Sequence, residues 1–499
     1  MPDKKRIIII GAGVAGMSAG CYGQMNGYDT EIYEMNNIPG GLCTGWKRLD
    51  YIIDGCFEWM IGISPDSVFN KQWLEVGALQ NKEIMVHKEF CRCEFSDGKK
   101  IIIYADADKL ESHLINIAPE DAGSITEITT AIKKLAGAFG GTMTRKPQSG
   151  LTGLIRTGIR FFPLIRYFRK YGKISIREYA RKNIKNTDLR EAFNHIFLAD
   201  YSMAILLFNL ACYANKDAGL PMGGSLGVVN SMATRYENLG GRINYKSIVN
   251  RIESKKERAT GIKLEDGRII SGDIVISAVD GHHTLFDLLK GKYLTKKISK
   301  CYSGDYPTFT TVQVSLGVNA DLSDEAQWIH MKLDKPVVLA GQELSFISFN
   351  NYCHDKTMAP EGKSVIASHI FTKFEYWEKF DRKSHEYSEE KRKLAEEVIK
   401  SAEKRFPSIK GKIEVIDVAT PLTYQRYTNV WRGAYMTWII TPGSKILSKI
   451  PNKLPGLRNF YMIGQWVSSP GTPGALKTGR KVIQDICKMD EKQFQTSIP

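Results

Sequence analysis

The order of apolar and polar residues along the 499-residue chain predicts a mixed α/β protein. Residues 6–10, which include four consecutive Ile, are expected to form a short buried strand, and residues 30–33, 274–279 and 459–464 are expected to form further strands. Runs of this kind are typical of parallel strands that are buried on both faces. Residues 309–316, 344–349 and 364–371 are also strand-like and fall in one block of the chain. These runs predict two separate sheets.

Two segments carry helical spacing. Residues 226–239 form an amphipathic pattern, and residues 389–405 form a longer one with Ser388 as the candidate N-cap. In the longer segment Leu394, Val398 and Ala402 recur at four-residue steps, which favours a face packed in the core. A mixed β-sheet covered by helices is therefore expected for residues 291–454.

A nucleotide-binding motif follows the first strand. Gly11-Ala12-Gly13-Val14-Ala15-Gly16 precedes a helix of small residues. In such a motif Gly11 permits the tight turn, Gly13 lets the backbone approach a pyrophosphate, and Gly16 lets the helix pack on the strand. Glu34 ends the second strand, eighteen residues after Gly16, where an acid binds a ribose 2′-hydroxyl and repels a 2′-phosphate.

Further segments extend this motif into a pattern with a family likeness. Gly40-Gly41 follows Glu34, residues 221–224 and 240–252 stand in the middle of the chain, and residues 459–475 stand near its end. Their order and spacing resemble the phytoene desaturase-like branch of the flavin amine oxidase superfamily. That family usually has a basic residue after the glycine pair, whereas this chain has Leu42.

The resemblance implies FAD as the cofactor and a Rossmann-like FAD-binding domain of the glutathione-reductase type. This domain is discontinuous and comprises residues 1–70 with 210–290 and 455–490. Residues 71–209 are then a helical, basic, membrane-contacting region, and residues 291–454 a substrate domain. The resemblance also implies which positions contact FAD, and Val249 and the positions near the C-terminus would do so through their backbone. These positions are Gly11, Gly13, Ala15, Gly16, Glu34, Gly40, Gly41, Val249, Gly464, Pro473, Gly474 and Ala475.

Candidate catalytic residues are few. Asp54 and Glu58 follow the Gly-Gly loop, and either acts as a proton acceptor if burial raises its pKa, or is an ordinary solvated or paired carboxylate. Tyr435 and Trp438 belong to a segment that in the family lies beside the flavin and the substrate tunnel; the alternative is that they are core aromatics. The nine histidines and nine cysteines are scattered, without metal-ligand or disulfide spacing, so no metal site is expected and a reduced, intracellular setting is favoured.

The net charge of +15 is a local feature. Residues 128–184 contain thirteen Lys and Arg against one acid, Glu178, and the basic residues alternate with bulky apolar ones. Arg156, Arg160, Arg166 and Arg169 would suit an interfacial helix on an anionic membrane. A solvated basic face of a core helix is the alternative. Nucleic acid is disfavoured because no nucleic-acid-binding module is recognisable, and a cytoplasmic, peripheral membrane protein is expected.

The expected function is oxidation by FAD of C–C bonds in an apolar isoprenoid or carotenoid-like lipid, that is, desaturation. Flavin takes a hydride from carbon, so such a site needs few dedicated side chains. A quinone, oxygen or another acceptor would reoxidise the flavin. Three alternatives stay open: amine oxidation, saturation or isomerisation of a polyene on the same fold, and a non-catalytic lipid-binding role like that of the Rab GDP-dissociation inhibitors.

Overall fold

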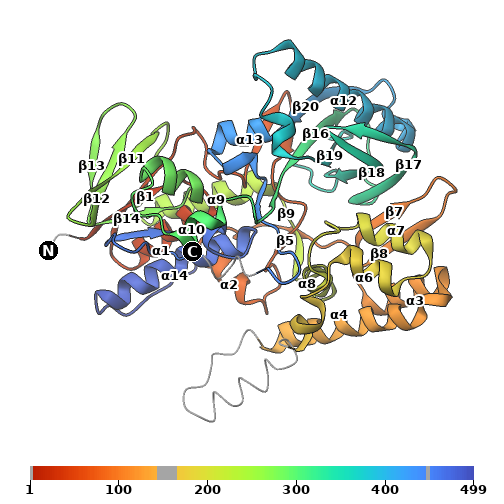
Figure 1. Ribbon diagram of the computed structural model, residues 1–499, viewed down its shortest axis with the longest axis horizontal. Coiled ribbons are helices and arrows are strands. Elements are labelled where there is room, and N and C mark those ends of the chain that lie inside the picture. Colours follow the sequence, from red (N-terminus) through yellow and green to blue (C-terminus); the bar gives the residue numbers. More distant parts are fainter. Residues whose placement is uncertain (1–3, 143–165, 445–449) are drawn as a thin grey trace, which may run out of the picture.

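A five-stranded parallel sheet forms one half of the computed structural model, which describes residues 4–142, 166–444 and 450–499 (Figure 1). All neighbouring strands run parallel, and the four Ile side chains of the central β1 are buried. The predicted strands at the start, middle and end of the chain thus meet in one sheet. In spatial order they are β10 (Arg242–Asn244), β2 (Asp29–Tyr33), β1 (Arg6–Ile10), β14 (Ile274–Ser277) and β22 (Phe460–Met462).

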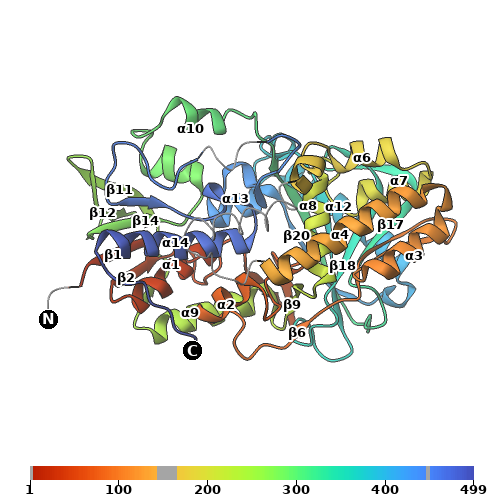
Figure 2. The same cartoon turned by 90° about the horizontal axis from the view of Figure 1, so that it is seen from below.

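Helices α1 (Val14–Met25), α9 (Gly224–Asn238) and α14 (Thr472–Met489) pack beside this sheet, and Figure 2 shows α1 and α14 lying side by side. The approach of α14 to α1 requires a glycine. A Cβ atom on Gly479 would lie 2.5 Å from the carbonyl oxygen of Ala15. Small residues therefore bring the N-termini of the two helices close together at the carboxyl edge of the sheet.

A seven-stranded mixed sheet forms the second half. One of its faces is covered by α12 (His385–Arg405), whose Leu394, Val398 and Ala402 are buried, as predicted. The helix begins four residues earlier than expected, because Ser384 and not Ser388 is the N-cap and accepts a hydrogen bond from the backbone N–H of Tyr387. The strand order is β20 (Ile413–Ala419), β16 (Thr311–Val318), β19 (Ser364–Phe371), β18 (Gln342–Asn351), β17 (Trp328–Leu339), β7 (Glu89–Glu94) and β8 (Lys100–Tyr104).

The range 71–209 differs in part from its expected helical character. Strands β7 and β8 lie within it and extend the second sheet, since β7 pairs in parallel with β17. The described residues from 107 to 195 are mainly helical and pack with α8 in one hydrophobic core, whereas α2 packs in the core of the nucleotide end. The helices are α2 (Val68–Glu75), α3 (Ala107–Ile117), α4 (Ala122–Thr142), α6 (Ile176–Asn183), α7 (Thr187–His195) and α8 (Met203–Ala214).

The basic segment is described only from residue 166 onward, so Arg156 and Arg160 lie outside the described residues. Residues 166–171 are helical, with Arg166 and Arg169 exposed and Tyr167 and Tyr171 buried. Within the described ranges, no helix has the length and apolar character needed to cross a bilayer.

Smaller elements join the two halves. A three-stranded antiparallel sheet flanks the nucleotide end and consists of β11 (Val249–Lys255), β12 (Arg258–Leu264) and β13 (Ile269–Ser271). The connecting strands are β3 (Gly45–Arg48), β4 (Tyr51–Asp54), β5 (Met60–Ile61), β6 (Ile84–Met85), β9 (Ala218–Pro221), β15 (Thr308–Phe309) and β21 (Met436–Trp438). The remaining helices are α10 (Lys296–Cys301), α11 (Phe374–Trp377) and α13 (Pro421–Thr428).

Candidate active site

The first glycine loop lies where β1 meets α1. Gly11 has φ +94°, and a Cβ on Gly16 would lie 2.0 Å from the carbonyl oxygen of Gly11, so neither position accepts a larger residue without strain. A Cβ on Gly13 would instead have no neighbour closer than 3.7 Å. Gly13 therefore leaves open space in front of the N-terminus of α1, where free backbone N–H groups favour an anion.

Glu34 lies at the end of β2 beside this loop and is 4% exposed. One carboxylate oxygen accepts a hydrogen bond from the backbone N–H of Ala12 at 2.8 Å, and the other accepts from the backbone N–H of Asn36 at 2.9 Å. These bonds fix the carboxylate at the cavity wall, and its remaining acceptor capacity suits a pair of ribose hydroxyls. Val249, at the start of β11, lines the same end of the cavity.

The second glycine loop and the C-terminal helix complete this end. Gly40 (φ +119°) donates from its backbone N–H to the carbonyl of Ala12 at 2.9 Å, and Gly41 (φ +63°) follows it. At α14, Pro473 lies in the first turn, and a Cβ on Gly474 would lie 2.2 Å from the carbonyl oxygen of Ser469. Gly464 and Ala475 also line the cavity. Two helix N-termini, glycine-rich backbone and one fixed acid are what a bound FAD requires.

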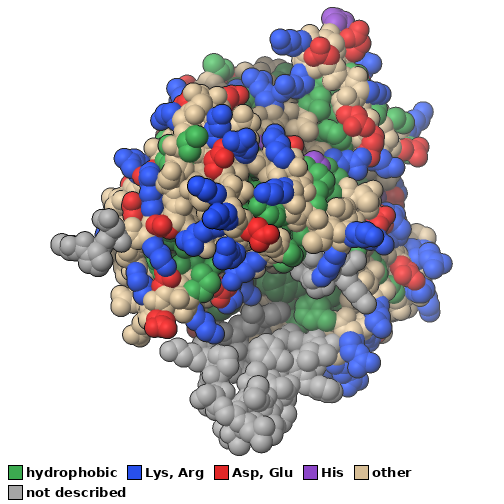
Figure 3. All heavy atoms as spheres, turned by 60° about the vertical axis from the view of Figure 1, so that its left-hand side comes forward, with side chains coloured by type: hydrophobic (Ala, Val, Ile, Leu, Met, Phe, Trp, Pro, Cys, Tyr) green, Lys and Arg blue, Asp and Glu red, His purple; other side chains and the backbone are tan. Residues whose placement is uncertain are grey.

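One cavity joins these loops to the second sheet and encloses about 740 Å³. A space-filling view shows a hollow in the surface with hydrophobic side chains at its floor (Figure 3). Beyond the nucleotide loops, aromatic and aliphatic side chains from β17, β18, α8, the α7–α8 connection and the residues beside β5 and β21 make up most of the wall. They include Trp59, Phe197, Leu198, Tyr201, Ile205, Trp328, Phe346 and Ile440.

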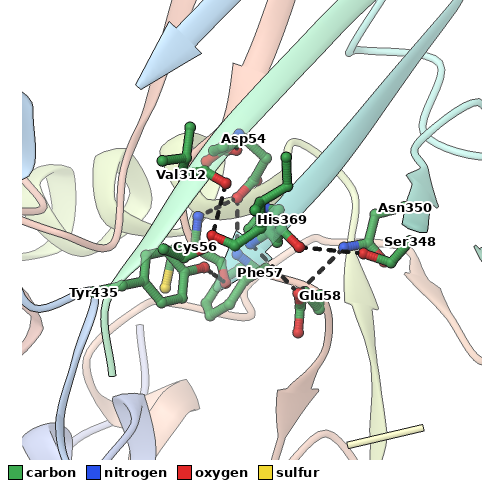
Figure 4. Close-up of polar contacts among 12 residues, drawn as sticks. Asp54, Cys56, Phe57, Glu58, Val312, Ser348, Asn350, His369 and Tyr435 are labelled. Carbon is green, nitrogen blue, oxygen red and sulfur yellow. Dashed lines mark hydrogen bonds and ion pairs between the residues drawn. The ribbon is translucent and has the colours of Figure 1, made fainter. Parts of the chain in front are cut away.

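Glu58 is a carboxyl residue that lines this cavity. Burial raises the pKa of the Glu58 carboxyl to about 7, and a hydrogen bond from the Asn350 amide, at 3.2 Å, partly opposes that rise. His369 Nδ1 lies 3.7 Å from the same carboxyl oxygen. In Figure 4 this oxygen faces Asn350, while the other turns away from it. A carboxyl with this pKa exchanges a proton near neutral pH.

Asp54 has a different place. Its carboxylate accepts hydrogen bonds from the backbone N–H groups of Cys56, Phe57 and Ser225 and from the Ser225 hydroxyl, all between 2.6 and 2.8 Å. Figure 4 shows Asp54 beside Cys56 and Phe57. Asp54 is 2% exposed and does not line the large cavity in the described structure. Burial raises its pKa, and the four hydrogen bonds oppose that rise. Asp54 ties the turn before Glu58 to the N-terminus of α9 and is a structural residue.

The two aromatic candidates, Tyr435 and Trp438, differ in whether they line the cavity. Tyr435 lines the cavity, and its hydroxyl donates to the backbone carbonyl of Cys56 at 2.8 Å. Its ring stands edge-on to His369, with centroids 5.7 Å apart. Trp438 is 1% exposed, packs against Trp466 at 4.9 Å, and is not among the cavity-lining side chains of the described chain. The expected position in the tunnel wall therefore fits Tyr435, and the core alternative fits Trp438.

Three histidines and Asn350 join the site although sequence reasoning passed over them. His195, His330 and His369 all line the cavity, and burial lowers their pKa values to about 4, 3 and 4. They are therefore uncharged at neutral pH. A histidine among the apolar residues of a predicted strand, as in residues 364–371, is a signal that could have indicated a site residue. That pattern does not predict the strand pairing that places the histidine in the cavity.

Among the described residues no group of three or more His, Cys, Asp or Glu side chains is arranged to hold a metal ion.

Asp280, which follows β14 at the nucleotide end, is a second cavity-lining carboxyl whose pKa burial raises to about 7. Its carboxylate accepts a hydrogen bond from the backbone N–H of His283 at 2.8 Å. Two cavity-lining carboxyls, Glu58 and Asp280, therefore have a pKa raised to about 7, and of these two Glu58 is the one close to the second sheet.

Comparison with known proteins gives a consistent family. The model of the flavin-containing amine oxidoreductase family matches residues 14–487. Prolycopene isomerase 1 of an Oncidium hybrid cultivar is 25% identical over 455 residues, which cover 86% of this chain and 74% of the relative. The lycopene-forming phytoene desaturase of a Paracoccus species is 22% identical over 504 residues, 97% of each chain. An inactive all-trans-retinol 13,14-reductase of Danio rerio is 23% identical over 535 residues, covering 98% and 87%.

Solved structures share the fold. An oxidoreductase from Methanosarcina mazei superposes with a TM-score of 0.59 at 16% identity, over 96% of this chain and 100% of the other. Wild-type putrescine oxidase bound to putrescine gives a TM-score of 0.59 at 13% identity, over 97% and 99%. The family match spans both halves of the molecule and includes the second glycine loop. The chain therefore belongs to the flavin-containing amine oxidoreductase family, in its phytoene desaturase-like branch, and its cofactor is FAD.

Proposed function

We propose that this FAD-dependent oxidoreductase removes hydrogen from a C–C bond of an apolar isoprenoid, carotenoid-like lipid. The observation that carries the proposal is the wall of the cavity between the second sheet and α8. It is built of aromatic and aliphatic side chains, and its histidines are held uncharged by burial. Only an apolar ligand gains free energy along the whole length of such a wall.

The same wall argues against amine oxidation. A protonated amine is held most strongly by a carboxylate that stays charged at neutral pH. Glu58 is the carboxyl beside the second sheet, and its pKa of about 7 leaves a large fraction of it uncharged there. Glu343 also lines the cavity but is exposed to solvent. An ammonium group would therefore lose its hydration without a dependable counter-ion.

Desaturation removes a hydride from one carbon and a proton from its neighbour, and bound FAD is the hydride acceptor. The protein must hold the substrate, exclude water and take the proton. The apolar wall serves the first two needs. Glu58 takes the proton on its carboxylate, with the Asn350 amide and the His369 ring behind it to fix its position. Tyr435 packs against His369 and keeps that ring in place.

Saturation or isomerisation of a polyene is the second candidate, because the relatives include all-trans-retinol 13,14-reductases and prolycopene isomerases as well as phytoene desaturases. In saturation the direction is reversed, and Glu58 delivers the proton instead of taking it. A non-catalytic lipid-binding role has less support, since the glycines of both loops and Glu34 are present and suit FAD.

Delivery from an anionic membrane surface is part of the proposal. Phe168 is 44% exposed, lines the cavity, and stands between the exposed Arg166 and Arg169. An exposed aromatic flanked by basic residues is what an interfacial segment presents to anionic lipid. A lipid substrate would enter the cavity from that surface, and a quinone, oxygen or another acceptor would reoxidise the flavin.

The test is anaerobic mixing of the holoenzyme with an apolar isoprenoid hydrocarbon and, separately, with primary and secondary amines. Bleaching of the oxidised flavin by the hydrocarbon and not by the amines supports desaturation. If the oxidised enzyme is inert and the chemically reduced enzyme converts a polyene, the second candidate replaces it. Bleaching by amines alone would contradict both.

A further inference from the structure

Two ring nitrogens on one face of β17 have no hydrogen-bond partner in the described chain. Trp328 and His330 are two residues apart, so their side chains lie on the same face of the strand, and their ring centroids are 4.9 Å apart. Both residues line the cavity. Nε1 of Trp328 and Nε2 of His330 are buried without a partner, a state that costs free energy unless a ligand or water relieves it.

His195, at the end of α7, lies close to this pair. It also lines the cavity, stacks on Phe346 with centroids 4.2 Å apart, and its charge would depress the pKa of His330. Its Nε2 lies 3.4 Å from the Ser345 hydroxyl. Trp328, His330 and His195 are called the nitrogen patch below. They come from β17 and α7, so the patch is where the second sheet and the helical region meet in the cavity.

We propose that the nitrogen patch binds an uncharged oxygen group, an alcohol or a carbonyl, on an otherwise apolar chain. The proposal rests on the proposed function, because it concerns the substrate of the same cavity. Trp328 is a donor only, whereas a neutral imidazole donates from one nitrogen and accepts at the other. Such a set satisfies a hydroxyl or a carbonyl oxygen.

A carboxylate or an ammonium group fits the patch less well. Both would have to be desolvated beside rings that carry no charge of opposite sign at neutral pH. The nearby cation of Lys332 is already paired with Glu191 at 2.5 Å. The charges of Lys332 and Glu191 thus offset each other, and the nitrogen patch itself favours a neutral polar group.

The pairing of the strands sets the distance from this patch to Glu58. His330 lies directly opposite Ser348 on β18, and the Ser348 hydroxyl lies 3.5 Å from the backbone carbonyl of His369 on β19. His330 and His369 are therefore two strand spacings apart, about 10 Å. Because His369 lies 3.7 Å from Glu58, the oxygen group and the reacting bond are separated by a fixed length of chain. The patch would then select which bond reacts.

The experiment compares two ligands that differ only in oxygen. Geranylgeraniol and the hydrocarbon that lacks its hydroxyl are titrated into the holoenzyme, in one detergent, by calorimetry. The alcohol is expected to bind about tenfold more tightly, which corresponds to about 1.4 kcal/mol. His330→Leu should abolish that preference by weakening the alcohol and not the hydrocarbon, and Trp328→Phe should reduce it several-fold.

His385→Leu is the matched control, since His385 is 83% exposed on α12 and should leave both affinities unchanged. Retained FAD and unchanged hydrocarbon affinity show that each variant is folded. If His330→Leu fails to fold, the proposal is tested by the alcohol preference of the wild-type enzyme and by its reduction in Trp328→Phe. Equal affinity of the wild-type enzyme for alcohol and hydrocarbon would overturn the proposal while leaving the proposed function intact. A clear alcohol preference in an enzyme whose flavin reacts only with amines would overturn the proposed function alone.

Discussion

The two ends of the cavity are built on different principles. At the nucleotide end, the positions that matter are glycines and one acid in loops that join neighbouring elements, such as Gly11, Gly16 and Glu34. At the substrate end, the positions that matter lie on three strands of the second sheet, β17, β18 and β19, and in the turn around Glu58. Backbone geometry in the glycine loops defines the first end, and side chains that strand pairing brings together define the second.

This difference decides what each end tolerates. A loop that must hold a left-handed glycine or let two backbones touch fails as a whole when a Cβ is added. A wall of packed side chains is more tolerant of exchange between apolar residues and sensitive to polar groups and protonation instead. The predictions below test this contrast, from the largest expected effect to the smallest.

Gly16→Val should abolish FAD retention. The added Cβ would lie 2.0 Å from the carbonyl oxygen of Gly11 and 3.2 Å from the Cβ of Ala278, so α1 must move away from β1. The bound flavin per protein after gel filtration measures the effect. Gly123→Ala is the control, because a Cβ there meets no atom within 4 Å. A Gly16→Val protein that keeps its full flavin content would show that the loop is less constrained than its geometry implies.

Asp54→Asn should lower the free energy of unfolding by about 3 kcal/mol. The substitution turns one acceptor of the carboxylate into a donor facing the N–H groups of Ser225, Cys56 or Phe57. Denaturant titration of the holoenzyme measures it. Asp97→Asn, at an exposed turn, should change stability little. A catalytic Asp54 would give the opposite outcome, a stable variant with no turnover.

Replacing Arg166 and Arg169 together by Gln should weaken binding to anionic vesicles roughly 30-fold, because each basic residue near such a surface is worth about 1 kcal/mol. Co-sedimentation with vesicles that contain phosphatidylserine measures this, and neutral vesicles should show no difference. The same exchange at Lys400 and Lys404, which are exposed on α12, is the control. Unchanged co-sedimentation would refute the membrane surface as the route of entry.

Glu58→Gln should stabilise the protein slightly at alkaline pH. The folded-state pKa of Glu58 is about 7, above the ordinary value of 4.5, so the folded protein binds more protons than the unfolded chain between these values. Stability from this group is therefore lost as pH rises through that window. Thermal unfolding at pH 5 and at pH 8 should show a gain for the variant only at pH 8. A gain at both values would mean that the pKa of Glu58 is not raised.

Much of the nucleotide end follows from the sequence, because Gly11, Gly16 and Glu34 belong to one local motif, in which Gly16 approaches Gly11 and Glu34 accepts a hydrogen bond from Ala12. The strands at residues 6–10 and 364–371 and the core face of α12 follow in the same way from spacing alone. The sequence predicts Ser388 as the N-cap of α12, whereas the structure has Ser384. The two serines are four residues apart and offer the same local signal, and the burial of Tyr387 favours the earlier one.

The substrate end does not follow, because its residues meet only through pairing across the chain. His369 is brought to Glu58 by the β18–β19 and β16–β19 pairs, and β7 joins the sheet from a range that looked helical. Trp438 and Tyr435 lie three residues apart, yet one is buried in the core and the other lines the cavity. Sequence spacing cannot choose between them without the neighbours that cover each ring.

The most direct test of the account is the rate of flavin reduction by an apolar isoprenoid, measured anaerobically from pH 5 to 9 in the wild-type enzyme and in Glu58→Gln. If Glu58 takes the proton, the wild-type rate rises with pH through a midpoint near 7, because the carboxylate form increases. The Glu58→Gln rate should be at least about 100-fold lower and flat across that midpoint, with FAD content unchanged. Glu343→Gln, at the exposed part of the cavity, should retain the wild-type profile. A Glu58→Gln enzyme with the wild-type rate and pH midpoint would contradict the account.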